Sequence, residues 1–72
     1  MKIQKNRNNL TTETKRPLLG AASEVDDALK ILMRRMQAED LIGALEWSDI
    51  LATRVSQLTR QLYHANAIAK SR

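Results

Sequence analysis

The second half of the chain carries apolar residues at a spacing that fits one long α-helix. Successive apolar positions are three or four residues apart. An α-helix turns by about 100° per residue, so these positions stay on one side of it. They are Ala44, Trp47, Leu51, Val55, Leu58, Leu62, Ala65 and Ala69. The spacing predicts a helix over about residues 44–69 whose apolar side is close to a coiled-coil seam.

A shorter helix is predicted over about residues 23–38. Ser23 can cap its first turn, and the acidic residues that follow favour the positive end of the helix dipole. The apolar residues on its main side are Val25, Ala28, Leu29, Leu32 and Met36. We also expect Met33 and Met36 to be core residues.

The apolar pattern breaks between the two predicted helices. A straight helix would place apolar residues near positions 39, 40 and 43, but Glu39, Asp40 and Gly43 stand there. Gly43 disfavours a helix interior, and Asp40 can cap a following helix. We therefore predict a turn at about residues 39–43, so that the chain folds back into an antiparallel hairpin.

Charge alternates along the chain. Five basic residues against Glu13 give residues 1–16 a net charge of +4, residues 17–49 carry −4, and residues 50–72 carry +4. In an antiparallel hairpin the basic end of the second helix would approach the acidic start of the first. The pairs expected are Arg60 and Lys70 with Glu24, Asp26 and Asp27.

Residues 1–16 have no apolar period and are predicted to form a flexible basic arm. Its basic residues could contact phosphates, together with one on the second helix. These candidate nucleic-acid-binding residues are Lys2, Lys5, Arg7, Lys15, Arg16 and Arg60. No aromatic residue interleaves with the basic residues of the arm, so it offers no base stacking.

A chain of 72 residues buries only about 60% of its unfolded surface. Cysteine is absent and His64 is the only histidine, so neither a disulfide nor a metal site supplements the core. We therefore predict an all-α protein, a two-helix hairpin that dimerises into a four-helix bundle. The expected dimer and core residues are Leu32, Met36, Leu51, Val55, Leu58 and Leu62.

Function follows less directly from the sequence. No Gly-rich phosphate loop, nucleophile motif or membrane-length apolar run is present. We expect a non-enzymatic cytoplasmic protein without cofactor, small-molecule substrate or membrane. Apolar residues near the turn, with one tyrosine, are the candidate protein-binding site: Leu41, Leu45, Trp47, Ile50 and Tyr63. Trp47 is open to two interpretations, a core residue or a binding hot spot.

The leading hypothesis is a small regulator or adaptor that binds a larger protein and modulates its activity, in the inhibitory direction. The alternative is a nucleic-acid-binding regulator that uses the basic arm and the basic end of the second helix.

Overall fold

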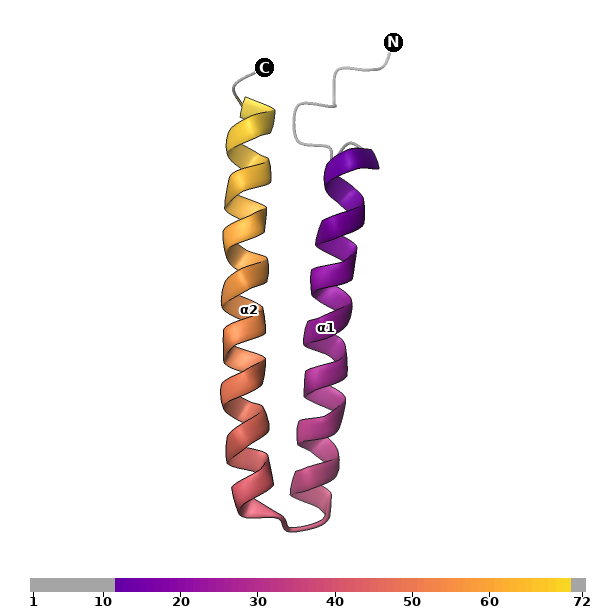
Figure 1. The fold of residues 1–72 in the computed structure, drawn as a ribbon, viewed down its shortest axis with the longest axis vertical. Helices are drawn as coiled ribbons and strands as arrows, with labels where there is room; N and C mark the ends of the chain where they lie inside the picture. The colour runs from indigo at the N-terminus through magenta and orange to yellow at the C-terminus, as the bar shows by residue number, and fades with distance from the viewer. Residues whose placement is uncertain (1–11, 71–72) are drawn as a thin grey trace.

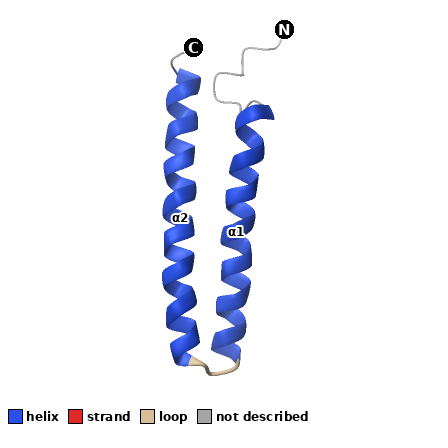
Figure 2. Ribbon diagram, in the orientation of Figure 1, coloured by secondary structure: helices blue, strands red, loops and turns tan. Residues whose placement is uncertain are grey.

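The computed structural model describes residues 12–70, which form two antiparallel α-helices in contact along their length (Figure 1). Helix α1 spans Thr12–Gln37, and helix α2 spans Leu41–Lys70. The described residues contain no strand, and the only loop among them is the turn at residues 38–40 (Figure 2). The predicted all-α hairpin is therefore confirmed. Neither helix in this part of the chain is both long and apolar enough to cross a membrane.

Helix α1 begins well before the predicted start at Ser23. It includes Pro17, which cannot donate the backbone hydrogen bond of a helix interior. Leu18 compensates, because it is only 6% exposed and gains from packing against the longer α2. Residues 12–16, predicted as part of the arm, are thus helical. Residues 1–11, with Lys2, Lys5 and Arg7, lie outside the described residues.

The turn ends α1 through a compact set of backbone hydrogen bonds. Glu39 has a φ of 58°, the left-handed conformation that closes many helices. Its N–H donates to the Met36 carbonyl over 3.0 Å, and the Asp40 N–H donates to the Arg35 carbonyl over 2.9 Å. This pair of bonds is a Schellman motif, so the last carbonyls of α1 have partners.

The same turn starts α2, three residues earlier than predicted. Asp40 Oδ1 accepts a hydrogen bond from the Gly43 N–H over 2.9 Å, which is the N-cap role expected for Asp40. A Cβ on Gly43 would lie 2.8 Å from Asp40 Cγ and 3.1 Å from Arg35 Cδ. Gly43 therefore belongs to the first turn of α2, where the capping carboxylate leaves no room for a side chain.

Two contacts fix how the helices are aligned. Arg54 pairs with Glu24, their Nη1 and Oε1 atoms 3.6 Å apart, and Arg35 lies over Gly43. Each residue further along α1 therefore lies beside a residue one position earlier in α2. The predicted pairing of Glu24 with Arg60 or Lys70 is wrong, because this alignment places Arg54 beside Glu24 and carries Lys70 past the start of α1.

The hairpin has a thin core. Among the described residues, only Leu18, Ala28 and Ala44 are buried hydrophobic residues, and no large side chain is fully buried. Two of these three are alanines, which contribute little apolar area. The contact between the helices therefore leaves most of the large apolar side chains partly in water.

Candidate functional site

One stripe of residues on each helix forms the contact between α1 and α2. The α1 stripe is Leu18, Ala21, Val25, Ala28 and Leu32, and the α2 stripe is Ala44, Trp47, Leu51, Arg54 and Leu58. All ten are buried or half-buried. They repeat every three or four residues, as a helix packed along one line requires.

The residues beside these stripes divide the hairpin into two broad faces. A residue one position after the stripe points about 100° to one side of it. Helix α2 runs antiparallel to α1, and the stripes of the two helices face each other. These two reversals cancel, so the residues that follow the stripe on α1 and on α2 reach the same broad face of the hairpin. Residues that precede the stripe reach the other face.

The face that follows the stripes is apolar. Leu29 and Met33 on α1 follow Ala28 and Leu32, while Val55 on α2 follows Arg54. Met36 and Leu62 lie on the same side by helical spacing. We call these five residues the apolar face: Leu29, Met33, Met36, Val55 and Leu62. Their exposed fractions run from 42% to 55%, so a single hairpin leaves all five partly in water.

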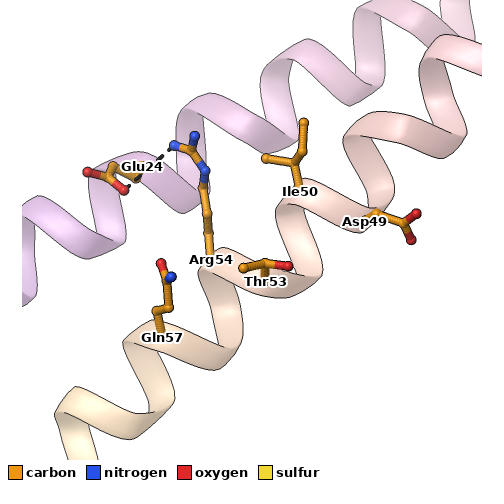
Figure 3. A pocket seen from close by; sticks show the side chains of 6 residues that line it. All are labelled: Glu24, Asp49, Ile50, Thr53, Arg54 and Gln57. Carbon is orange, nitrogen blue, oxygen red and sulfur yellow. Dashed lines mark ion pairs between the residues drawn. The ribbon is translucent and has the colours of Figure 1, made fainter.

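The face that precedes the stripes is polar. A shallow groove of about 370 Å³ lies there, and Figure 3 shows the side chains that line it. They are Glu24, Asp49, Ile50, Thr53, Arg54 and Gln57. The Arg54–Glu24 ion pair bridges the two helices at this groove. Glu24 is largely exposed and Arg54 is partly exposed, so water screens the pair and it contributes at most about 1 kcal/mol. We call this side the polar face.

A second exposed apolar group lies at the start of α2, beside the turn. Leu41 and Ile42 are 72% and 73% exposed, and Leu45 is 60% exposed. Ile42 and Leu45 flank the stripe residue Ala44 such that both are directed largely away from α1. We call Leu41, Ile42 and Leu45 the closed-end patch.

The predicted protein-binding residues do not share one surface. Leu41 and Leu45 lie one helical turn apart in the closed-end patch. Trp47 is half-buried in the contact stripe, whereas Ile50 lines the groove of the polar face. Tyr63 is 72% exposed and lies toward the open end of the hairpin. Of the five, the structure brings only Leu41 and Leu45 together.

The predicted dimer and core residues also separate into two groups. Leu32, Leu51 and Leu58 are half-buried in the stripes, while Met36, Val55 and Leu62 belong to the apolar face. The expectation that Met33 and Met36 are core residues is wrong for a single hairpin. The spacing of Leu29, Met33 and Met36 by four and three residues was the available signal for a second stripe on α1.

Sequence reasoning also missed Arg54. Its position three residues after Leu51 and four before Leu58 puts it in the contact stripe, where an aliphatic stem can pack while the charged end reaches the surface. Arg54 is half-buried in this way. The pattern alone disfavours it there, because charged residues are uncommon at helix contacts.

Charge is unequal between the two ends of the hairpin. The open half consists of residues 12–25 and 54–70, whose five basic and two acidic residues give +3. The closed half, residues 26–53, has three basic and six acidic residues, which give −3. Within the closed half, Lys30 Nζ lies 3.0 Å from Asp26 Oδ2. The hydrogen bond to Asp26 raises the pKa of Lys30 above its ordinary value.

The candidate nucleic-acid-binding residues within the described part of the chain do not converge. Lys15, Arg16 and Arg60 are all exposed. Lys15 and Arg16 are consecutive and point about 100° apart, and Arg60, two residues after Leu58, points away from α1. Residues 12–70 also contain no group of three or more His, Cys, Asp or Glu side chains placed to hold a metal ion.

Comparison with known proteins gives this hairpin no relatives: no protein-family model, no curated protein and no solved structure matches the chain.

Proposed function

We propose that this protein is a small dimeric regulator or adaptor that binds a larger protein and inhibits its activity. The observation that carries the proposal is the imbalance between buried and exposed apolar side chains. Three hydrophobic residues are buried in the described chain, whereas eleven large ones are exposed. Apolar surface that stays in water on this scale is typical of a protein–protein interaction site.

The exposed apolar residues suit two separate interactions. The apolar face runs along both helices, and a second hairpin laid on it would complete a four-helix bundle. Within the closed-end patch, Ile42 is directed away from both α1 and the apolar face, whereas Leu41 and Leu45 lie beside that face by helical spacing. The part of the patch around Ile42 therefore stays accessible in the bundle. We assign dimerisation to the apolar face and partner binding to the closed-end patch.

Binding at the closed-end patch follows a known mode of recognition. Leu41, Ile42 and Leu45 present apolar side chains from one helical turn, as helices that dock in the apolar groove of a partner do. Glu39, Asp40 and Glu46 surround the patch with negative charge, which favours a groove with a basic rim. Such binding changes the partner's activity by covering its surface and needs no catalytic group.

Affinity capture from host lysate tests this function. The full chain is immobilised, and capture is compared between lysate treated with nuclease and untreated lysate. We expect a retained protein whose binding is weakened about 30-fold, roughly 2 kcal/mol, when a charge enters the patch in Ile42→Lys. Thr53→Lys places the same charge on the polar face and is the matched control, with binding unchanged.

Two results would contradict the proposal. Capture that is equal for Ile42→Lys and the parent chain would remove the closed-end patch as the site. Capture that nuclease abolishes would favour nucleic-acid binding, which the excess positive charge of the open half supports. In that case affinity should fall with salt, with a slope of about −0.9 per phosphate contact on duplex DNA.

A further inference from the structure

We propose that a second copy of this chain covers the apolar face, and that the two copies stack with their closed ends at opposite ends of the bundle. The inference rests on the dimer of the proposed function and adds its interface and its orientation. A dimer of this kind would carry one closed-end patch at each end.

Surface area supports a second copy as the occupant. The chain exposes 5751 Å², whereas a compact monomer of 8.2 kDa exposes roughly 4500 Å². The excess is on the order of 1200 Å², and each partner in a standard interface buries roughly 800 Å². The elongated hairpin, with extents of 54 × 19 × 15 Å, therefore has surface enough for one such interface on one broad side.

The side chains of the apolar face suit close packing of helices. Ser48 and Ala52 follow the stripe residues Trp47 and Leu51, so they lie on the same broad face between its large residues. Small residues at these points let the α2 helices of two copies approach, while Leu29 and Val55 fill the space beside them. Alternation of large and small side chains is what a bundle core requires.

Charge selects the orientation of the two copies. Stacking with the closed ends together would place two open halves of +3 side by side, and two closed halves of −3 side by side. The opposite orientation lays each positive half on a negative half. Like charges in apposition disfavour the first arrangement, and complementary potentials favour the second. The sign of the charge is opposite at the two ends of one hairpin, so the preference extends over its whole length.

This orientation has a consequence for the partner. A two-fold axis across the middle of the apolar face separates the two closed-end patches by roughly 30–35 Å along the bundle, at about 1.5 Å per residue. The dimer would then hold two partner molecules at opposite ends, or two sites of one partner. A dimer with its closed ends together would instead merge both patches into one surface.

Distance measurement between spin labels tests the orientation without any partner present. The chain has no cysteine, so Gln37→Cys in the full chain accepts a single label on the exposed end of α1. We expect a label-to-label distance of about 40 Å, given the rise of about 1.5 Å per residue. Closed ends together would give less than about 30 Å, and that result would overturn the proposed orientation.

Thr53→Cys is the matched control. Residue 53 lies near the middle of the hairpin on the polar face, so its label-to-label distance spans the thickness of the bundle, is similar in both orientations, and reports only that a dimer has formed. Absence of a dipolar signal at both positions would overturn the second copy as the occupant. A distance of about 40 Å at position 37 with no partner captured from lysate would support the dimer and contradict only the proposed function.

Discussion

The two broad faces of the hairpin flank the same helix–helix contact, yet they have opposite character. The apolar face presents five large side chains that no residue of the described chain covers fully. The polar face presents a groove with the Glu24–Arg54 ion pair across it. Residues on the two faces differ by only one or two positions in sequence, as Val55 and Thr53 do. A shift of that size along a helix decides which of the two faces a side chain joins.

The largest expected difference between the faces comes from one charge placed on each. Val55→Lys puts an ammonium group into the proposed dimer interface, where removing it from water without a partner is costly. We expect the dimer to weaken about 30-fold or more, roughly 2 kcal/mol, in sedimentation equilibrium. Thr53→Lys should leave dissociation unchanged. Equal effects from both variants would show that the distinction between the faces is wrong.

Loss of the Asp40 cap should lower the stability of the fold, by less than the effect of Val55→Lys on the dimer. Asp40→Ala removes the hydrogen bond to the Gly43 N–H, which caps α2. We expect about 1 kcal/mol of lost stability, measured by chemical denaturation followed by circular dichroism. The turn lies outside both faces. The folded Asp40→Ala variant should therefore dimerise with the same affinity as the folded parent chain. A change in affinity as large as that of Val55→Lys would place the turn in the interface.

Glycine at position 39 should stabilise the turn. Glu39 adopts a left-handed conformation, which costs a side-chain-bearing residue roughly 1–2 kcal/mol. Glycine removes that cost but adds freedom to the unfolded chain. Glu39→Gly should therefore raise the free energy of unfolding by about 0.5–1 kcal/mol in the same denaturation experiment. A destabilised variant would indicate that Glu39 makes a favourable interaction beyond its backbone role.

The smallest effect is expected on the polar face. Glu24→Gln removes the charge that pairs with Arg54, and the Glu24 side chain is largely in water while that of Arg54 is partly exposed. We expect less than about 0.5 kcal/mol of lost stability, with the difference vanishing at high salt as screening increases. A loss above about 1 kcal/mol that persists in high salt would mean that a partner buries the polar face as well.

The sequence predicted the parts of the fold that depend on local spacing. The steps of three and four residues from Ala44 to Ala69 predicted α2. The turn was predicted because Glu39, Asp40 and Gly43 stand where a straight helix would need apolar residues. The start of α1 was missed because Pro17 favours a first helical position over an interior one, and Gly20 weakens a helix that begins there. The burial of Leu18 against a distant segment outweighs them, and no local pattern reports such packing.

The candidate surfaces were harder to predict for a geometric reason. Helical spacing gives the side of a helix on which a residue lies, but not the side on which its neighbour packs. Leu29 and Met36 were assigned to the main side of the first helix, and Val55 and Leu62 to the seam of the second. Only the observed stripes, which pass through Ala28 and Arg54, show that these residues share one exposed face. Ile50 was grouped with Leu45 for the same reason and lies on the other side.

The mass of the full chain in solution tests the central claim, that the apolar face is covered by a second copy. Light scattering after size exclusion, at micromolar concentration and moderate salt, should give twice the mass of the chain, and Val55→Lys should return it to the mass of one chain. A folded parent protein that stays at the mass of one chain at these concentrations would contradict the account.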